Sequence, residues 1–376
     1  MNPRRRAWLL RLAALPFAQL AQLAHSANSA HSAAQAASID HSALAFPRDH
    51  GAHLSARIEW WYGTGWLGTE AAPTHGFQLT FFRSRTGLAK DVASRFAGRY
   101  LLFAHAAVTQ LTGGVHLHDQ RIVRWSGAPD AALGSAASER GAVRIKDWSL
   151  RDDGRAWQAR LPAAEFMLDL VFTRGQALLL QGDAGHSRKG PDERQASRYY
   201  SEPQLAAAGR ITLRGQATQA HEPTQGRAWL DHEWSDEILH PQAVGWDWIG
   251  MNLFDGSALT AFRLRRADGS ALWAGGSLRA AGGVARSFGA EEVRFTPGHF
   301  WRSPGSGANY PVQWQVDTPS GRHTVRALLD AQELDSRAST GTIYWEGLSE
   351  LLDAQGRRVG LGYLEMTGYA GAIKLA

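Results

Sequence analysis

Cysteine is absent from the 376 residues of this chain. Its absence excludes disulfide bonds, thiolate nucleophiles and zinc sites built from cysteine, and it leaves the redox compartment open. Two catalytic motifs are also missing: the G-x-S-x-G elbow of α/β-hydrolases and the G-x-x-x-x-G-K-[ST] loop that cradles phosphates. No long stretch shows a helical period of apolar residues, so the pattern points away from helical fold classes.

Acidic residues are missing from the first 37 positions, where Arg4, Arg5, Arg6 and Arg11 carry four positive charges. Without these four, 36 of the 40 basic residues remain against 35 acidic ones, and the formal net charge falls from +5 to about +1. The basic character therefore belongs to the N-terminal segment. It predicts no nucleic-acid partner.

The same segment predicts an export signal in residues 1–37, which also include the start of a spacer. A basic start, Met1–Arg6, precedes an apolar run, Ala7–Ala24, and small residues follow. The pair Arg5-Arg6 resembles a twin-arginine signal. We expect a periplasmic or secreted protein. No other stretch is long and apolar enough to cross a membrane, so membrane contact is predicted only through the signal segment before its cleavage.

The remaining chain is predicted to be all-β. Its 40 glycines and 15 tryptophans favour β-structure with many turns, and turn residues separate short strand-like runs. Ile58–Tyr62 is predicted as a strand ended by Gly63 and Gly65, and Phe77–Arg85 as the next strand. Two short stretches could form helices: Pro203–Ala208 and Leu348–Leu352.

An internal repeat divides the chain. The pattern L-T-x-F-R-x-R occurs at Leu79–Arg85 and again at Leu259–Arg265. An acid followed by tryptophan precedes each copy, at Glu59-Trp60 and at Asp247-Trp248. Near the ends of the halves, Gly226-x-x-Trp229-Leu230-Asp231 parallels Gly360-x-x-Tyr363-Leu364-Glu365. We predict two homologous β-barrel domains, at 46–236 and 244–376.

A closed meander barrel pairs its first strand with its last. This would bring Glu59–Tyr62 beside Trp229–Trp234, and Asp247-Trp248 beside Tyr363–Glu365. Strand alternation assigns the residues from 229 to 234 to two faces. One face would carry Trp229, Asp231 and Glu233, and the other Leu230, His232 and Trp234.

Several short signatures carry a resemblance to a known family. They are Glu59-Trp60-Trp61-Tyr62, Ser187-Arg188-Lys189-Gly190, Arg198-Tyr199-Tyr200-Ser201, Trp229–Trp234, Trp246-Asp247-Trp248 and Tyr344-Trp345-Glu346-Gly347. In this order they resemble exported bacterial proteins of the carotenoid 1,2-hydratase-like, two-lipocalin family, often described as predicted secreted hydrolases. The resemblance implies two tandem lipocalin-like barrels.

The family's relatives include hydratases that add water to an isoprenoid double bond and pericyclases of the same fold. Its hydratases use a histidine and a tryptophan two residues apart, which His232 and Trp234 match. They also use a downstream aromatic residue and aspartate, for which Trp246-Asp247 is the best candidate. Fold alone does not assign a reaction.

Hydration of an alkene needs a protonated acid and a way to stabilise a carbocation. Carboxylic acids desolvated among indole rings can stay protonated, and the ring faces attract cations. The candidate catalytic residues are Asp231, His232, Glu233, Asp247 and Glu59. The candidate substrate contacts are Trp60, Trp61, Tyr62, Trp229, Trp234, Trp246, Trp248, Tyr199, Tyr200, Tyr344 and Tyr363. No cofactor is predicted. No metal site is predicted either, because His116 and His118 share a strand face without a defined third ligand.

Three hypotheses about the function remain open. The first is acid-catalysed hydration or isomerisation of an alkene in a hydrophobic, isoprenoid-like or lipid-like small molecule. The second is a carrier for such a molecule, and the third is a shape-selective pericyclase. Acids that point into a cavity without a cationic partner favour chemistry, whereas acids paired with arginines favour a structural role. For the loop Ser187–Gly190 a plain solvated loop is predicted, ahead of a loop that gates a barrel mouth or attracts an anionic headgroup.

Overall fold

The computed structural model describes residues 42–88, 92, 94, 96–215, 225–237 and 239–373. The predicted signal peptide lies outside this part of the chain. Within it, the secondary structure consists of β-strands and two single-turn 3₁₀ helices, η2 (Arg48–His50) and η3 (Ala290–Glu292). None of the described helices has the length and hydropathy that a membrane span requires. The all-β prediction is confirmed.

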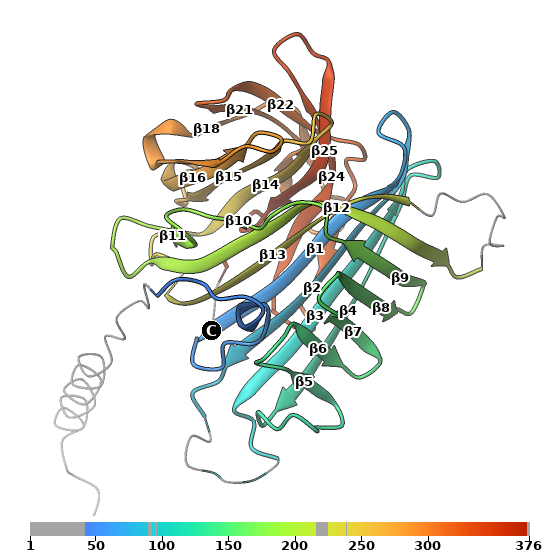
Figure 1. The fold of residues 1–376 in the computed structure, drawn as a ribbon. Coiled ribbons are helices and arrows are strands. Elements are labelled where there is room, and N and C mark those ends of the chain that lie inside the picture. The colour runs from blue at the N-terminus through green and yellow to red at the C-terminus, as the bar shows by residue number, and fades with distance from the viewer. Residues whose placement is uncertain are drawn as a thin grey trace, which may run out of the picture. The chain divides into compact units, whose positions relative to one another are not determined.

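The first sheet takes its strands from the N-terminal half of the chain (Figure 1). Its described strands are β1 (Ile58–Gly68), β2 (Pro73–Arg85), β3 (Tyr100–Gln110), β4 (Val115–Trp125), β5 (Gly134–Ala136), β6 (Ala142–Ile145), β7 (Trp148–Asp152), β8 (Ala156–Pro162), β9 (Phe166–Thr173), β10 (Leu179–Leu180), β11 (His186–Arg188), β12 (Ala196–Leu213) and β13 (Gln225–Glu237). They pair in the order β4-β3-β2-β1-β13-β12-β9-β8-β7-β6-β5, with β10 and β11 on β12.

The second sheet repeats this arrangement in the C-terminal half. Its described strands are β14 (Gly245–Leu253), β15 (Ala258–Arg265), β16 (Ala271–Arg279), β17 (Ala285–Phe288), β18 (Arg294–Pro297), β21 (Gln313–Thr318), β22 (Gly321–Ala327), β23 (Glu333–Asp335), β24 (Ile343–Leu352) and β25 (Arg358–Met366). The order is β17-β16-β15-β14-β25-β24-β22-β21-β18, with β23 on β24. A separate hairpin joins β19 (Phe300–Arg302) to β20 (Asn309–Pro311).

The predicted pairing of first and last strands is confirmed in both sheets. In the first sheet β1 lies antiparallel to β13, with Trp61 opposite His232. In the second, β14 lies antiparallel to β25, with Trp248 opposite Glu365. The open edges of the first sheet are β4 and β5, which lie close together without a described ladder between them, so this barrel is nearly closed.

The sequence repeat has a structural cause. Glu59 lies opposite Arg83 on the neighbouring strand, and Asp247 lies opposite Arg263 in the same way. Nε of each arginine approaches the carboxylate, at 2.8 Å for Arg83 and 2.7 Å for Arg263. Each copy of the L-T-x-F-R-x-R pattern thus supplies the cation that neutralises a buried acid on the first strand of its sheet.

The ends of the two halves align differently from the sequence prediction. Measured from the acid–arginine pairs, Glu59 lies opposite Trp234, whereas Asp247 lies opposite Met366. Glu365 therefore takes the structural place of Glu233, two residues beyond Asp231. Because side chains alternate with a period of two, the offset keeps the acid on the same face of the sheet.

Two local predictions were wrong. Gly63 and Gly65 do not end the first strand, because β1 continues to Gly68. A Cβ on Gly65 would lie 2.6 Å from the Phe77 ring, so this glycine permits close packing across the sheet rather than a turn. The suggested helices also belong to strands, β12 and β24.

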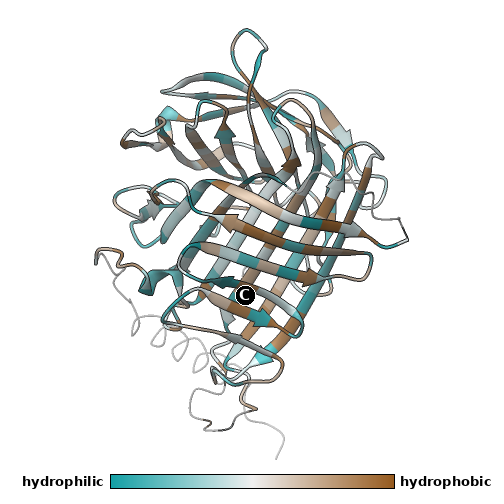
Figure 2. Cartoon of the chain, turned by 45° about the vertical axis from the view of Figure 1, so that its right-hand side comes forward, coloured by the Kyte–Doolittle hydropathy of each residue, from teal (hydrophilic) through white to brown (hydrophobic). Residues whose placement is uncertain are grey.

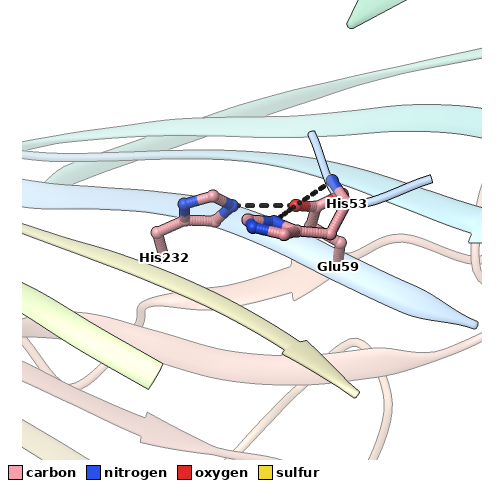
Figure 3. Close-up of side chains that lie close together, drawn as sticks. All are labelled: His53, Glu59 and His232. Carbon is pink, nitrogen blue, oxygen red and sulfur yellow. Dashed lines mark hydrogen bonds and ion pairs between the residues drawn. The ribbon is translucent and has the colours of Figure 1, made fainter. Parts of the chain in front are cut away.

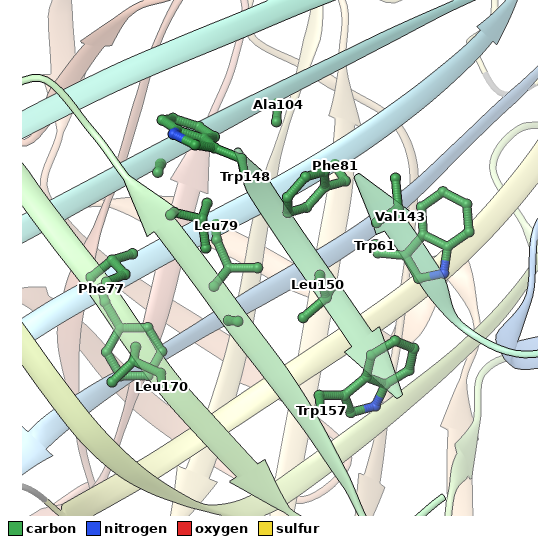
Figure 4. Packing of buried hydrophobic residues seen from close by; sticks show 14 of the residues in the cluster. Trp61, Phe77, Leu79, Phe81, Ala104, Val143, Trp148, Leu150, Trp157 and Leu170 are labelled. Atoms are coloured by element: carbon green, nitrogen blue, oxygen red, sulfur yellow. The ribbon is translucent and has the colours of Figure 1, made fainter. Parts of the chain in front are cut away.

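Strand alternation sorts the apolar side chains into separate cores. Figure 2 shows apolar and polar segments alternating along the strands of the first sheet. Trp61, Trp148 and Trp157 pack inside that sheet with leucines and phenylalanines of neighbouring strands (Figure 4). Tyr62, the next residue after Trp61, belongs instead to a core shared with Trp248 of the second sheet. Burying each large apolar side chain contributes roughly 1.5–3 kcal/mol.

The strands of the first sheet end at residue 237 and those of the second begin at 245. The chain from Ser42 onward nevertheless packs as one compact unit. The domain bounds 46–236 and 244–376 stay a prediction.

Candidate functional site

A cavity of about 180 Å³ lies where the outer faces of the two sheets meet. Trp60 and Tyr62 of β1 line one side, and Trp246 and Trp248 of β14 line the other. Most of the exposed wall is apolar. For comparison, a dry cavity of about 150 Å³ in another protein holds benzene. The cavity therefore has room for an apolar group of that size.

The predicted alternation along β13 is confirmed. Asp231 and Glu233 line the cavity, whereas His232 is fully buried on the opposite face. Trp234 shares that face with His232, and its ring stacks on His53 at 3.5 Å between centroids. Asp231 and Glu233 therefore face the cavity, whereas His232 of the same strand faces the interior of the first sheet.

Asp231 is held by three neutral donors. Its carboxylate accepts hydrogen bonds from the hydroxyls of Ser201 at 2.5 Å and Tyr199 at 2.8 Å, and from the Trp229 indole at 2.7 Å. Burial raises the pKa of Asp231 to about 7, although these donors act in the opposite direction. No arginine or lysine pairs with Asp231 among the described residues. This acid can exchange a proton near neutral pH.

Two further acids line the cavity and were missing from the predicted site. Glu346 of β24 and Glu365 of β25 are direct cross-strand neighbours. Burial and the nearby charge of Glu365 raise the pKa of Glu346 well above its ordinary value of 4.5. Burial raises the pKa of Glu365 to about 7, helped by Asp231 and Glu233. Both residues stood in the sequence motifs, Glu346 within Tyr344–Gly347 and Glu365 in the repeat.

Glu346 also has a buried carboxylate oxygen without a regular hydrogen bond. Its Oε1 is buried and makes no hydrogen bond of ordinary geometry within the described structure, and the same holds for the hydroxyl of Tyr62. The charges of Glu346 and Glu365 add to burial in raising the pKa of Tyr62 well above 10. The two groups also interact with each other, and this contact opposes the effect of burial on the pKa of Glu346.

Glu233 differs because it has a cation. Nζ of Lys189 lies 3.0 Å from its carboxylate, and the Ser197 hydroxyl donates to the same oxygen. The Lys189 ammonium also sits over the rings of Tyr199 and Phe262. The prediction of a solvated loop at Ser187–Gly190 was therefore wrong for Lys189, whose side chain is buried in the cavity wall.

Glu59 lies on the inner face of β1 rather than in the cavity. It is fully buried and contacts Arg83, His53 and His232. Burial alone would raise the pKa of Glu59, but hydrogen bonds from His232 and His53 and the charge of Arg83 hold it below its ordinary value. Burial lowers the pKa of His232. Neither residue reaches the cavity wall.

Asp247 occupies the equivalent inner position in the second sheet. Its Oδ2 lies 2.7 Å from Nε of Arg263 and 3.0 Å from Nε of Arg265, and the Tyr369 hydroxyl donates to its Oδ1 at 2.9 Å. Asp247 does not line the cavity, although its neighbours Trp246 and Trp248 do.

The predicted aromatic contacts divide in the same way. Those on the cavity wall are Trp60, Tyr62, Tyr199, Trp246, Trp248 and Tyr344. Trp229 and Tyr363 pack beside it in the core shared by the two sheets. Trp61, Tyr200 and Trp234 belong to other clusters and do not reach the wall.

A histidine missed by the sequence analysis completes the wall. His105 of β3 contacts the Tyr344 hydroxyl through Nδ1 at 2.9 Å and Ser339 through Nε2 at 2.8 Å. Burial lowers the pKa of His105 to about 3, so the imidazole is neutral near pH 7. Its neighbours on β3 are mostly apolar, and no motif distinguished it.

Fold and site together define a class: two lipocalin-like β-barrels in tandem, with an acid-lined apolar cavity where they meet. The AttH-like family profile matches residues 38–369. The chain belongs to the AttH-like family.

Solved structures agree with this assignment. A candidate AttH protein of Nitrosomonas europaea is 43% identical, with a TM-score of 0.80, and the match covers 89% of this chain and 99% of that one. Kievitone hydratase of Nectria haematococca shares the fold at 13% identity and a TM-score of 0.64, covering 88% and 94%. A search of the curated proteins found no match.

Proposed function

We propose that this protein is a hydratase-type enzyme that adds water to an alkene of a hydrophobic small molecule, isoprenoid-like or lipid-like. The observation that carries the proposal is the set of three acids, Asp231, Glu346 and Glu365, which line an apolar cavity and have raised pKa values. Such acids are the groups that can donate a proton to carbon near neutral pH.

The reaction assigns opposite roles to two acids. Glu346, whose pKa is raised well above its ordinary value by burial and by the charge of Glu365, transfers its proton to one alkene carbon, which leaves a carbocation on the other. The faces of Trp60 and Trp248 stabilise this cation by roughly 0.5–2 kcal/mol each. A water oxygen then bonds to the cationic carbon, and its proton passes to the Asp231 carboxylate. Return of that proton to Glu346 completes the net addition of water.

The residues around Asp231 suit the role of base. Three donors hold its carboxylate in one orientation, as a catalytic group requires. Glu365 lies opposite Glu346, and its charge adds to burial in raising the pKa of that acid. The hydratase of the same fold in Nectria haematococca supports the proposal by showing that this architecture can hold such chemistry.

The finer assignment to carotenoid 1,2-hydratase-like enzymes is part of this proposal and rests on His232 and Trp234. Both lie on the inner face, away from the cavity. We propose that their contacts with Glu59 and His53 fix the position of β13, while the cavity acids perform the proton transfers. Export to the periplasm is likewise proposed, from the N-terminal segment alone.

The test incubates the full chain with a panel of isoprenoid and prenylated phenolic alkenes in ¹⁸O-labelled water. Mass spectrometry would detect products carrying one added labelled water. We expect Glu346→Gln and Asp231→Asn each to lower the rate by about 10²–10⁴-fold. The surface variant Asp335→Asn, whose carboxylate pairs with exposed Arg337, is the control and should react at the wild-type rate. Binding of the panel without any labelled product would favour the carrier reading instead.

A further inference from the structure

A second chemical cluster lies on the inner face of β1 and β13. His53, Glu59 and His232 are the described group whose metal-ligand atoms all fall within 4.8 Å of one another. Oε1 of Glu59 lies 2.8 Å from Nδ1 of His53 and 3.0 Å from Nε2 of His232. Figure 3 shows both imidazoles in contact with the Glu59 carboxylate.

We propose that His53, Glu59 and His232 form a binding site for one divalent transition-metal ion, with Zn²⁺ as the probe of choice. Two imidazoles and one carboxylate are a donor set that zinc accepts, with a further position left for water. The same set also suits other first-row divalent ions. The site is separate from the cavity acids and does not depend on the proposed hydration.

The outer partners of the three ligands fit this assignment. Nε2 of His53 lies 3.3 Å from Oδ1 of Asp49, and Nδ1 of His232 lies 3.1 Å from the backbone carbonyl of Asp49. Without a metal, the inner nitrogens donate to the Glu59 carboxylate. On binding a metal they would release these protons and present lone pairs to the ion, while each outer N–H is donated to Asp49. Metal-binding histidines are oriented by carboxylates and carbonyls in this way.

The carboxylate ligand is oriented as well. Arg83 donates from Nε to Oε2 of Glu59 at 2.8 Å, which leaves Oε1 facing the two histidines. The two carboxylates of Glu59 and Asp49 also bring negative charge to the site, partly offset by Arg83 and by the Arg48 guanidinium on Asp49. A divalent ion would thus replace protons in a cluster that already contains two acids.

Access to the site is one-sided. Glu59 and His232 are fully buried, whereas the His53 side chain is 19% exposed. His53 comes from the segment before β1 and stacks on Trp234. An ion would enter past His53, and this segment would be pinned to the barrel by the bound metal. Residue patterns did not indicate this site, since His53 stands outside any strand pattern and Glu59 and His232 are 173 residues apart.

The test titrates the chelator-treated full chain with ZnCl₂ by isothermal calorimetry, and with Co²⁺ to record visible d–d absorption. We expect one ion per chain for the wild type. His53→Gln, at the accessible edge of the site, should weaken binding by more than about 100-fold. Asp49→Asn should weaken it by about 10–100-fold, as loss of an outer partner does. His299→Gln, an exposed histidine paired with Asp330, is the control and should bind like the wild type.

Two results would overturn the proposal: no stoichiometric binding to the wild type, or equal binding to wild type and His53→Gln. Circular dichroism of each variant shows whether it is folded before titration. A variant that loses zinc but still hydrates alkenes would be consistent with a metal site that is separate from the reaction. Absence of hydration in a chain that binds zinc would contradict the proposed function and not the metal site.

Discussion

The acids of the cavity and the acids of the two barrel interiors show how position decides the behaviour of one residue type. Glu59 and Asp247 each face an arginine at equivalent places in the two sheets. Asp231 and Glu346 are equally buried, but their neighbours are tyrosines, tryptophans and another acid. The first pair is neutralised by fixed cations, whereas the second can stay neutral only by holding protons. We therefore expect stability to depend on the first kind of acid, and the proposed chemistry on the second.

Substitutions that remove one side of the proton transfer should have the largest effect. We expect Glu346→Gln to reduce labelled-water addition by about 10²–10⁴-fold while its far-ultraviolet circular dichroism stays that of the wild type. The amide retains the size of the side chain and suits a neutral site. Should Glu346→Gln and Asp335→Asn turn over equally fast, Glu346 is not the acid.

Breaking an arginine pair should instead destabilise the fold. Arg83→Met leaves the fully buried Glu59 without its guanidinium, a change that typically costs about 3–5 kcal/mol of unfolding free energy. Urea denaturation of Arg83→Met and of Asp231→Asn measures the contrast. We expect the large loss only for Arg83→Met, since the amide in Asp231→Asn removes a costly buried charge. Equal losses in the two variants would contradict the division of the acids into two kinds.

The two kinds of acid should also respond oppositely to pH. The folded pKa of Asp231 is about 7, against an ordinary 3.8, so between these values the folded chain holds a proton that the unfolded chain releases. Its contribution to stability is greatest below about pH 4 and falls as pH rises to about 7. The pKa of Glu59 is lowered from 4.5, so its contribution is present above about pH 4.5 and is lost as pH falls further.

Urea midpoints at pH 5 and pH 8 can isolate the Asp231 effect. We expect Asp231→Asn to lose less stability than the wild type over this interval, because the asparagine cannot ionise. If the wild type and Asp231→Asn lost equal stability between pH 5 and pH 8, Asp231 would be ionised over the whole interval.

The smallest effect should come from an exposed ion pair. Arg227 lies 3.2 Å from Glu70, and both side chains are about two-fifths exposed. We expect Glu70→Gln to change the unfolding free energy by less than about 1 kcal/mol, because water and salt screen such pairs. A cost near that of Arg83→Met would mean that burial is not what separates the acids.

Much of the fold could be predicted from residue patterns. Alternation along 229–234 separated Asp231 from His232 correctly, and the repeated acid-tryptophan and L-T-x-F-R-x-R motifs predicted two related sheets. These features are local, so a single strand displays them. The strand limits were less accurate near Gly65, where the glycine serves packing against Phe77.

The site itself could be predicted only in part. Nothing local tells whether Asp231 will meet a cation, because that depends on which side chains arrive from β12 and β14. Glu346 and Glu365 meet Asp231 only when the second sheet packs on the first. Lys189 lies in the cavity wall although its loop was predicted to be solvated. Glu346 and Glu365 lie more than 100 positions from Asp231, so no local pattern could bring these three acids together.

The protonation state of the cavity acids is the most direct test of this account. Infrared difference spectra recorded from about pH 4 to pH 9 would follow the carbonyl band of protonated carboxyl groups. We predict that part of this band persists above about pH 6 in the wild type and is reduced in Glu346→Gln, while the control Asp335→Asn retains it. Disappearance of the whole band by about pH 5 in the wild type would show that every carboxyl group is ionised, and it would contradict the account.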